Sequence, residues 1–145
     1  MAKSSTLDIA IAMLKVLGGH GYLVGGSYVV DRQAANDVDI IVHQHVYEIG
    51  NPNMAGWREL SAGDEKYDEI DHVRIITIYE GKIGDDKANI IVVGEAFWPA
   101  HIGAINEMRN NPEFYLKRED RVELHRSLAR QVADIAGIDI PEKAL

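Results

Sequence analysis

The segment LVGGSYVVDRQAANDVDIIV, residues 23–42, limits the fold more than any other part of the chain. A short apolar run ends at two glycines, and a second apolar run begins with Asp37 and Asp39. Residues two apart in a strand point to the same side, with Cα atoms about 6.5 Å apart. Two carboxylates this close resist joint ionisation unless a cation lies between them. The segment therefore predicts two strands, a glycine turn between them and a cation beside the second strand.

The glycine turn supplies a second, complementary feature. Gly25 and Gly26 let the backbone approach a ligand closely, and Ser27 offers a hydroxyl group. Residues 27–32 are expected to open a short helix, whose first N–H groups favour an anion. Aspartate oxygens suit a hard divalent cation such as Mg²⁺. Together the two features predict a phosphate-binding turn that faces a metal-binding carboxylate pair.

The order of these parts resembles the nucleotidyltransferase fold, the superfamily of DNA polymerase beta. The resemblance covers residues 24–42, with residues 25–27 as the glycine motif and Asp37 and Asp39 as the carboxylate motif. Its GGSYVVD form is closer to small antibiotic or tRNA nucleotidyltransferases than to minimal antitoxin-type members. The resemblance implies an α+β fold, with a short mixed sheet of about four to five strands and helices packed on one side.

The resemblance also implies ligands and roles for particular residues. Asp37 and Asp39 would hold Mg²⁺ or Mn²⁺. Gly25, Gly26 and Ser27 would form the nucleotide-binding turn, with Gly26 and Ser27 against the β- and γ-phosphates of a nucleoside triphosphate.

The family's third carboxylate has no acidic match in the best candidate strand, KANIIVVG. The expected hydrophobic-Asp-hydrophobic position holds Ala88, Asn89 and Ile90. An amide coordinates a metal through its oxygen but accepts no proton, and a positioned general base contributes about 10²–10⁴ in rate. Asn89 is therefore expected in the catalytic site as a substituted third residue. The acids near strand ends that remain candidates to replace the missing carboxylate are Asp71, Glu80, Asp85, Asp86 and Glu95.

The remaining elements follow from periodicity and turn residues. Helices are expected over residues 7–17, from Pro99 toward Met108, and over residues 117–136. Strands are expected at 22–24 and 38–43 and in HVRIITIYEGKI and KANIIVVG, the last two joined as a hairpin through residues 81–86. Residues 44–71 are expected to form loops or short helical turns. Residues 1–145 are expected to form one domain, with the last helix packed on it.

Charge and composition exclude several classes of protein. The formal net charge of −8 repels nucleic acid at long range, so a polyanionic ligand needs a metal ion or a basic patch. No cysteine is present, which rules out disulfides and thiolate zinc sites and favours a reducing cytoplasm. Asp8 and Lys15 interrupt the first apolar stretch, unlike a signal peptide or a membrane span. A cytoplasmic protein without a membrane partner is expected.

Two further groups of polar residues have competing interpretations. Arg118, Arg121 and His125 recur on one side of the last helix and suit a triphosphate or a nucleic-acid backbone. Interleaved acids favour ordinary ion pairs within the helix instead. His43 and His45 have the spacing of a metal site on an extended strand, but exposed histidines at a strand end are the favoured interpretation.

Two functions from different classes follow, with a third interpretation behind them. The favoured one is a Mg²⁺-dependent nucleotidyltransferase, which moves a nucleoside monophosphate from a nucleoside triphosphate to a hydroxyl or phosphate acceptor. The alternative is a regulatory or interaction module that binds the nucleotide but has weak or no catalytic activity. The third is a structural domain with both aspartates at an exposed strand edge. The acceptor stays open among a small molecule, RNA and protein, and so short a chain is expected to act as a homodimer or with a partner protein.

Overall fold

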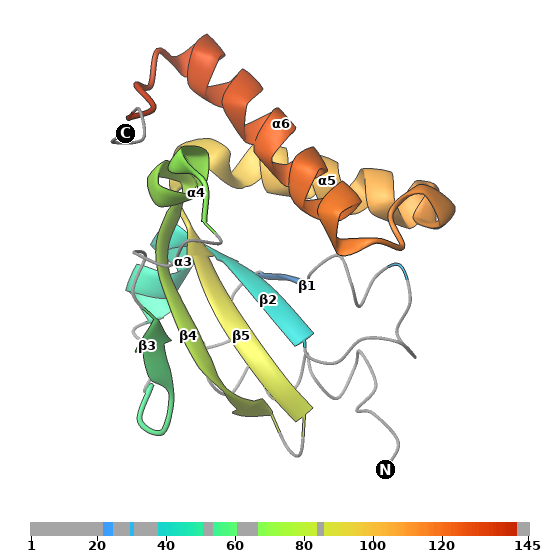
Figure 1. Cartoon of the computed structure of the whole chain (residues 1–145). Coiled ribbons are helices and arrows are strands. Elements are labelled where there is room, and N and C mark those ends of the chain that lie inside the picture. The colour runs from blue at the N-terminus through green and yellow to red at the C-terminus, as the bar shows by residue number, and fades with distance from the viewer. Residues whose placement is uncertain are drawn as a thin grey trace.

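The computed structural model describes residues 22–24, 30, 38–50, 54–60, 67–83 and 86–141. Several predicted features lie outside these residues: the helix over residues 7–17, the turn residues Gly25, Gly26 and Ser27, Asp37, and Asp85. The described elements form an α+β fold around one five-stranded mixed sheet (Figure 1). The predicted fold class is therefore confirmed.

The sheet has the strand order β1-β2-β5-β4-β3. Its strands are β1 (Tyr22–Val24), β2 (Val38–His43), β3 (Arg58–Leu60), β4 (Ile75–Ile83) and β5 (Asp86–Val93). The central neighbours β2 and β5 run parallel, and every other neighbouring pair is antiparallel. The predicted strands at 22–24 and 38–43 and the predicted hairpin of the two later strands are confirmed.

Short helices follow the strands, and two long helices complete the chain. They are α3 (Gln44–Gly50), α4 (Glu69–Arg74), α5 (Trp98–Asn110) and α6 (Arg118–Ala136), with 3-10 turns η1 (Glu95–Phe97) and η2 (Pro112–Phe114) on either side of α5. Pro99 lies in the first turn of α5, as predicted. Gly137 ends α6 with φ of 69°, a left-handed conformation that favours glycine.

The start of the predicted strand at HVRIITIYEGKI is wrong by three residues. Residues 72–74 belong to α4, because a capping box fixes the start of that helix. The Asp68 carboxylate accepts the N–H of Glu69 at 2.6 Å, and the Asp71 carboxylate accepts the N–H of Asp68 at 2.9 Å. These local hydrogen bonds outweigh the strand preference of the β-branched Val73.

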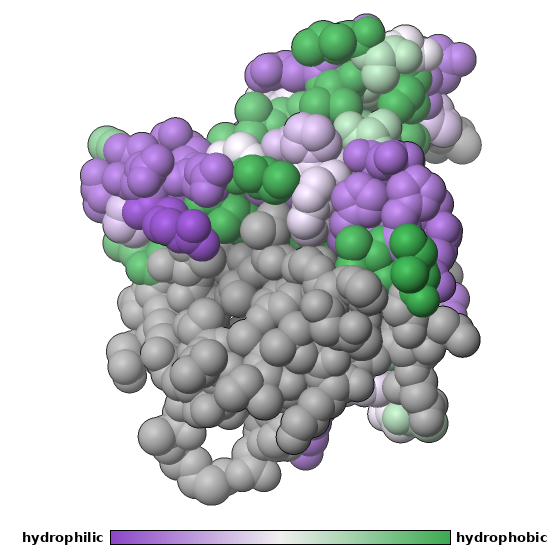
Figure 2. Space-filling model, turned by 180° about the vertical axis from the view of Figure 1, so that it is seen from behind, coloured by the Kyte–Doolittle hydropathy of each residue, from purple (hydrophilic) through white to green (hydrophobic). Residues whose placement is uncertain are grey.

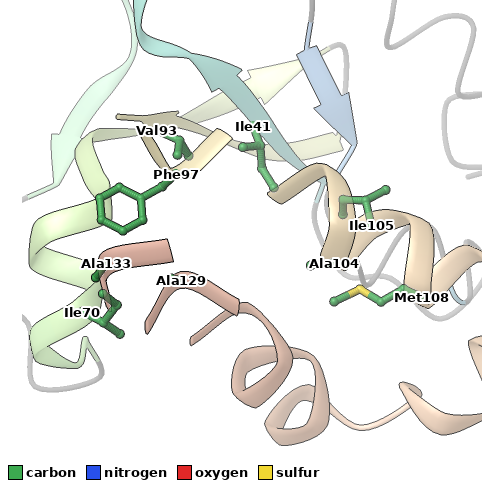
Figure 3. Packing of buried hydrophobic residues seen from close by; sticks show 9 residues of the cluster. All are labelled: Ile41, Ile70, Val93, Phe97, Ala104, Ile105, Met108, Ala129 and Ala133. Atoms are coloured by element: carbon green, nitrogen blue, oxygen red, sulfur yellow. The ribbon is translucent and has the colours of Figure 1, made fainter. Parts of the chain in front are cut away.

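The two central strands are buried on both faces. Ile40, Val42, Ile90 and Val92, each at most 1% exposed, alternate with Ile41 and Val93, which point to the opposite face. The second set packs against Ile105 and Met108 of α5 and against Ala129 and Ala133 of α6, as Figure 3 shows. The long helices therefore cross one face of the sheet (Figure 1).

The last helix packs on the sheet over most of its length but not in its last turn. Ala129 and Ala133 are buried, and Leu124, Leu128 and Val132 are partly buried against the core. Ile135 is 88% exposed, because it lies in the last turn, beyond the residues that contact the core.

Among the described residues, six large apolar side chains are exposed, and they come from several elements. The exposed ones are Ile49, Ile76, Ile102, Phe114, Leu116 and Ile135. They come from α3, β4, α5, the α5–α6 connection and α6. Seen from behind, the described surface mixes hydrophilic and hydrophobic residues (Figure 2). Scattered apolar side chains of this kind are normal on a protein surface and mark no site.

Gly81 was expected in the hairpin turn but lies inside β4. The Trp57 side chain packs so close to Gly81 that there is no room for a Cβ. An added Cβ would lie 2.5 Å from Cε3 of Trp57. We therefore expect Gly81→Ala to lower the free energy of unfolding by about 1–3 kcal/mol, because the overlap displaces the indole ring.

Gly103→Ala in α5 is the matched control for Gly81→Ala. Its added Cβ meets only Leu128 Cδ1, at an ordinary 3.8 Å, and alanine favours a helix by about 0.5–1 kcal/mol over glycine. Urea unfolding of both variants measures the two effects. Equal stability of Gly81→Ala and the wild type would contradict the packing argument.

Candidate functional site

The parallel pairing of β2 and β5 brings Asp39 and Asn89 together. The two residues are direct partners in the register and lie fifty positions apart in the chain. The Asn89 amide Nδ2 donates a hydrogen bond to Asp39 Oδ1 at 3.1 Å. Both side chains are partly exposed. Two residues that sequence analysis assigned to one site therefore touch in the structure.

Glu80 continues the same line of side chains on the next strand. It is the antiparallel partner of Asn89 and thus points to the same face of the sheet. Arg58 of β3 is the partner of Glu80, and its Nη2 lies 2.7 Å from Glu80 Oε1. We call Asp39, Asn89, Glu80 and Arg58 the polar row. It crosses β2, β5, β4 and β3, at the second residue of β2 and the fourth of the eight residues of β5.

The polar row lies on the face that α5 and α6 cross, but it is less covered than the core. Ile41 and Val93, on the same face, are buried under those helices. Farther toward the strand starts, Asp39 and Asn89 are partly exposed and the Glu80 side chain is 50% exposed. A ligand can reach the polar row from solvent.

Arg121, near the start of α6, is in electrostatic contact with Asp39. Burial and the nearby charge of Arg118 lower the pKa of Arg121, and the Asp39 carboxylate opposes that shift. Arg121 Nη1 also donates to the carbonyl oxygens of Tyr115 and Leu116, each at 2.8 Å. The guanidinium thus fixes the α5–α6 connection and brings positive charge toward Asp39.

Among the described residues, hydrogen bonds of the basic residues of α6 lead outside the helix. Arg121 donates to backbone carbonyls of the α5–α6 connection. Arg126 donates to Asp71 of α4, and Arg130 to Asp68, the capping residue of α4. His125 forms no surface stripe with the arginines, because its ring packs against His101 at a centroid distance of 4.9 Å. Periodicity placed these residues around a helix, but only helix packing decided their partners.

Two lysines lie beyond the polar row on the same face. Lys82 and Lys87 are direct partners in the β4–β5 hairpin, two residues past Glu80 and two before Asn89. Like charges directly opposite each other are destabilising unless an anion or solvent screens them. Lys82 and Lys87 therefore bring two positive charges to this face, in a hairpin whose sequence also contains Asp85 and Asp86.

Asp71 is unsuited to replace the third carboxylate. It is 3% exposed and accepts from Arg74 Nε at 2.8 Å and from Arg126 Nη2 at 2.8 Å. Burial alone raises the pKa of Asp71, but both arginines outweigh it and hold that pKa below its ordinary value. Arg130 of α6 binds Asp68, the capping residue of α4. These pairs join α4 to α6 and occupy the Asp71 carboxylate.

Glu95 is also remote from the polar row. It follows β5 at the opposite end from Asn89, and its Oε2 lies 2.7 Å from His45 Nε2. That hydrogen bond, with the negative charge of Glu95, raises the pKa of His45. His43 packs edge-on against Trp98 at a centroid distance of 5.4 Å. The side chains of Asp85 and Asp86 lie outside those described.

Of the candidate acids whose side chains are described, only Glu80 lies beside Asn89. The sequence named Glu80 as one of several acids near strand ends, and the strand register selects it. Arg58 had no sequence signal, because its position depends on the short strand β3 in a region rich in turn residues.

The donor chemistry at Asp39 and Asn89 fits Mg²⁺. Carboxylate and amide oxygens are the hard ligands that this ion uses in proteins, usually with several waters retained. Within the described ranges, no three His, Cys, Asp or Glu side chains are grouped to hold a metal. Asp37, the other expected metal ligand, precedes β2 and lies outside the described residues.

A cavity of about 480 Å³ lies elsewhere, between α4, β3 and the first half of β4. Its lining residues are Glu59, Leu60, Tyr67, Asp71, His72, Ile75, Ile76, Thr77 and Ile78. None of them belongs to the polar row. The wall is formed partly by Asp71, whose carboxylate is occupied by arginines. The cavity and the polar row are separate features of the sheet.

Comparisons of the chain with protein-family models, with curated proteins and with solved structures found no match. Among the described helices, none is both long and apolar enough to span a membrane. A function for the polar row therefore rests on its own chemistry and on the sequence motif of residues 25–37, which precedes β2.

The packed histidines His101 and His125 make the free energy of unfolding depend on pH. Burial, aided by the charge of Arg74, lowers the pKa of His125 from 6.5 to about 3, and burial with the charges of His125 and Arg74 also lowers that of His101. Between pH 6.5 and about 3 the unfolded chain binds protons that the folded chain excludes. The stability that His101 and His125 contribute should therefore be fully present above pH 6.5 and be lost below it, by up to about 1.4 kcal/mol per pH unit for each histidine.

Urea unfolding between about pH 8 and about pH 4.5 measures this slope. His125→Gln, which removes one titrating group, should flatten the slope. His72→Gln, at an exposed position of α4, is the control and should leave the slope unchanged. A wild-type stability that is independent of pH over this range would overturn the assignment.

Proposed function

We propose that the protein is a Mg²⁺-dependent nucleotidyltransferase, which transfers a nucleoside monophosphate from a nucleoside triphosphate to a hydroxyl or phosphate acceptor. The proposal rests on the contact between Asp39 and Asn89. The sequence assigned these residues to one site from two separate motifs. Their pairing on adjacent parallel strands is the arrangement that a shared site requires.

In the proposed reaction, Asp37 and Asp39 hold the metal ion, which neutralises the triphosphate when bound. Ser27 and the glycine turn hold the β- and γ-phosphates that leave as pyrophosphate. Asn89 orients the acceptor beside Asp39. Arg121 adds positive charge on the α6 side of Asp39 and favours a phosphate there.

A second function is favoured by one specific observation. Asn89 presents an amide, which donates a hydrogen bond to Asp39 and accepts no proton. A module that binds the nucleotide without efficient transfer is consistent with this substitution. The two functions share nucleotide binding and differ in turnover.

Nucleotide binding is expected to raise the melting temperature only when Mg²⁺ is present. A ligand at 100 times its Kd adds about 2.7 kcal/mol, which is several degrees for a chain of this size. Thermal unfolding with each of the four ribonucleoside triphosphates, with and without Mg²⁺, measures the effect.

Asp37→Asn/Asp39→Asn should abolish that shift, because it removes both metal-binding carboxylates. Glu113→Gln/Glu119→Gln makes the same change of charge at exposed positions and should preserve the shift. If wild type and both double variants respond alike, the nucleotide site is not where we propose it.

Asn89→Asp separates the two functions. If the protein is a slow enzyme, a carboxylate that acts as a positioned base at this position should raise pyrophosphate release by about 10²–10⁴-fold. A variant that binds nucleotide as the wild type does but releases no pyrophosphate would favour the binding module.

A further inference from the structure

The strand register places Glu80 beside Asn89, the residue that stands where a third carboxylate was expected. Asp39, Asn89 and Glu80 are consecutive partners across three adjacent strands, so their side chains share one face. Neighbouring strands lie about 4.8 Å apart, which puts the Cα atoms of Glu80 and Asp39 about 10 Å apart. The acid is thus one strand farther from Asp39 than Asn89 is, and its carboxylate is hydrogen-bonded to Arg58 on the strand beyond.

We propose, on the basis of the function proposed above, that Glu80 is the proton acceptor for the acceptor hydroxyl. The hydroxyl would lie over Asn89, between Asp39 and Glu80. Its proton passes to the Glu80 carboxylate as its oxygen forms a bond to the α-phosphorus. The bond from the α-phosphorus to the bridging oxygen of the β-phosphate breaks, and pyrophosphate leaves with that electron pair. Glu80 then returns its proton to solvent.

The order of residues across the polar row suits this role. Asn89 lies on the strand between Asp39 and Glu80 and is the direct register partner of both. A hydroxyl over Asn89 would therefore have a carboxylate-bearing residue on each side.

Arg58 pairs with Glu80, but the pair is exposed enough for Glu80 to exchange this partner for another. The pair is exposed, with side-chain exposures of 71% for Arg58 and 50% for Glu80. Exposed ion pairs contribute little to stability, so an arriving hydroxyl can replace one guanidinium hydrogen bond at small cost. The two buried arginine contacts of Asp71 allow no such exchange.

Glu80→Gln and Glu59→Gln form a matched pair of variants. Glu59 is a partner of Tyr79 and points to the opposite face of the sheet, so both variants remove one exposed carboxylate from neighbouring strands. Two quantities are measured with Mg²⁺: the Kd of each ribonucleoside triphosphate, and the rate of pyrophosphate release. The acceptor probes are water, glycerol and a short RNA with a free 3′ hydroxyl.

We expect Glu80→Gln to lower kcat by about 10²–10⁴ while the nucleotide Kd stays within threefold, because the acid moves a proton and binds no phosphate. Glu59→Gln should change neither quantity by more than twofold. Formate should restore part of the turnover of Glu80→Ala and none of that of Asp37→Asn/Asp39→Asn. Rescue by an external carboxylate distinguishes a proton acceptor from a residue that only supports the fold.

Three results would overturn the assignment of Glu80. Turnover by Glu80→Gln at the wild-type rate would rule out Glu80 as the proton acceptor and leave the proposed transferase function standing. Nucleotide binding by the wild type without pyrophosphate release to any probe would show that no working proton acceptor is present. Absence of Mg²⁺-dependent nucleotide binding in the wild type would overturn the proposed function itself, and the Glu80 assignment with it.

Discussion

The parallel pairing of β2 and β5 is the constraint on which the rest of the structure depends. Both strands are buried on both faces over residues 40–42 and 90–93, with Ile91 partly covered, as the centre of a mixed sheet requires. A shift of register by one residue would turn every buried side chain to the other face. The same register that satisfies the core therefore fixes Asp39 opposite Asn89. The polar contact follows from hydrophobic packing farther along the same strands.

Two polar systems in this protein differ in what they can do. The acids of α4 are tied to Arg74, Arg126 and Arg130, and this network joins α4 to α6. Because Asp71 is buried, losing one partner would leave an uncompensated charge, so the network has a structural role. The polar row is partly exposed and includes the surface ion pair of Arg58 and Glu80. Its side chains can exchange partners, which a binding or catalytic site requires.

Basic side chains from separate segments of the chain lie near the polar row. The formal net charge is −8, and a triphosphate approaching such a protein is repelled at long range. Arg121 from α6 and the facing Lys82 and Lys87 of the hairpin bring positive charge to the face that carries Asp39. These residues come from separate segments, and only the folded sheet and the last helix bring them to one surface.

The sequence by itself determined the strands at 22–24 and 38–43, the two long helices, the α+β class and the candidate residues Asp39 and Asn89. Alternation, turn residues and helix periodicity are local properties, so they can be predicted from short stretches of chain. Tertiary structure decided which acid lies beside Asn89, where the arginines of α6 bind, and that Gly81 serves packing against Trp57. These outcomes depend on strand register and helix packing between distant residues. A capping box also moved residues 72–74 from strand to helix, because hydrogen bonds at one helix end outweighed β propensity there.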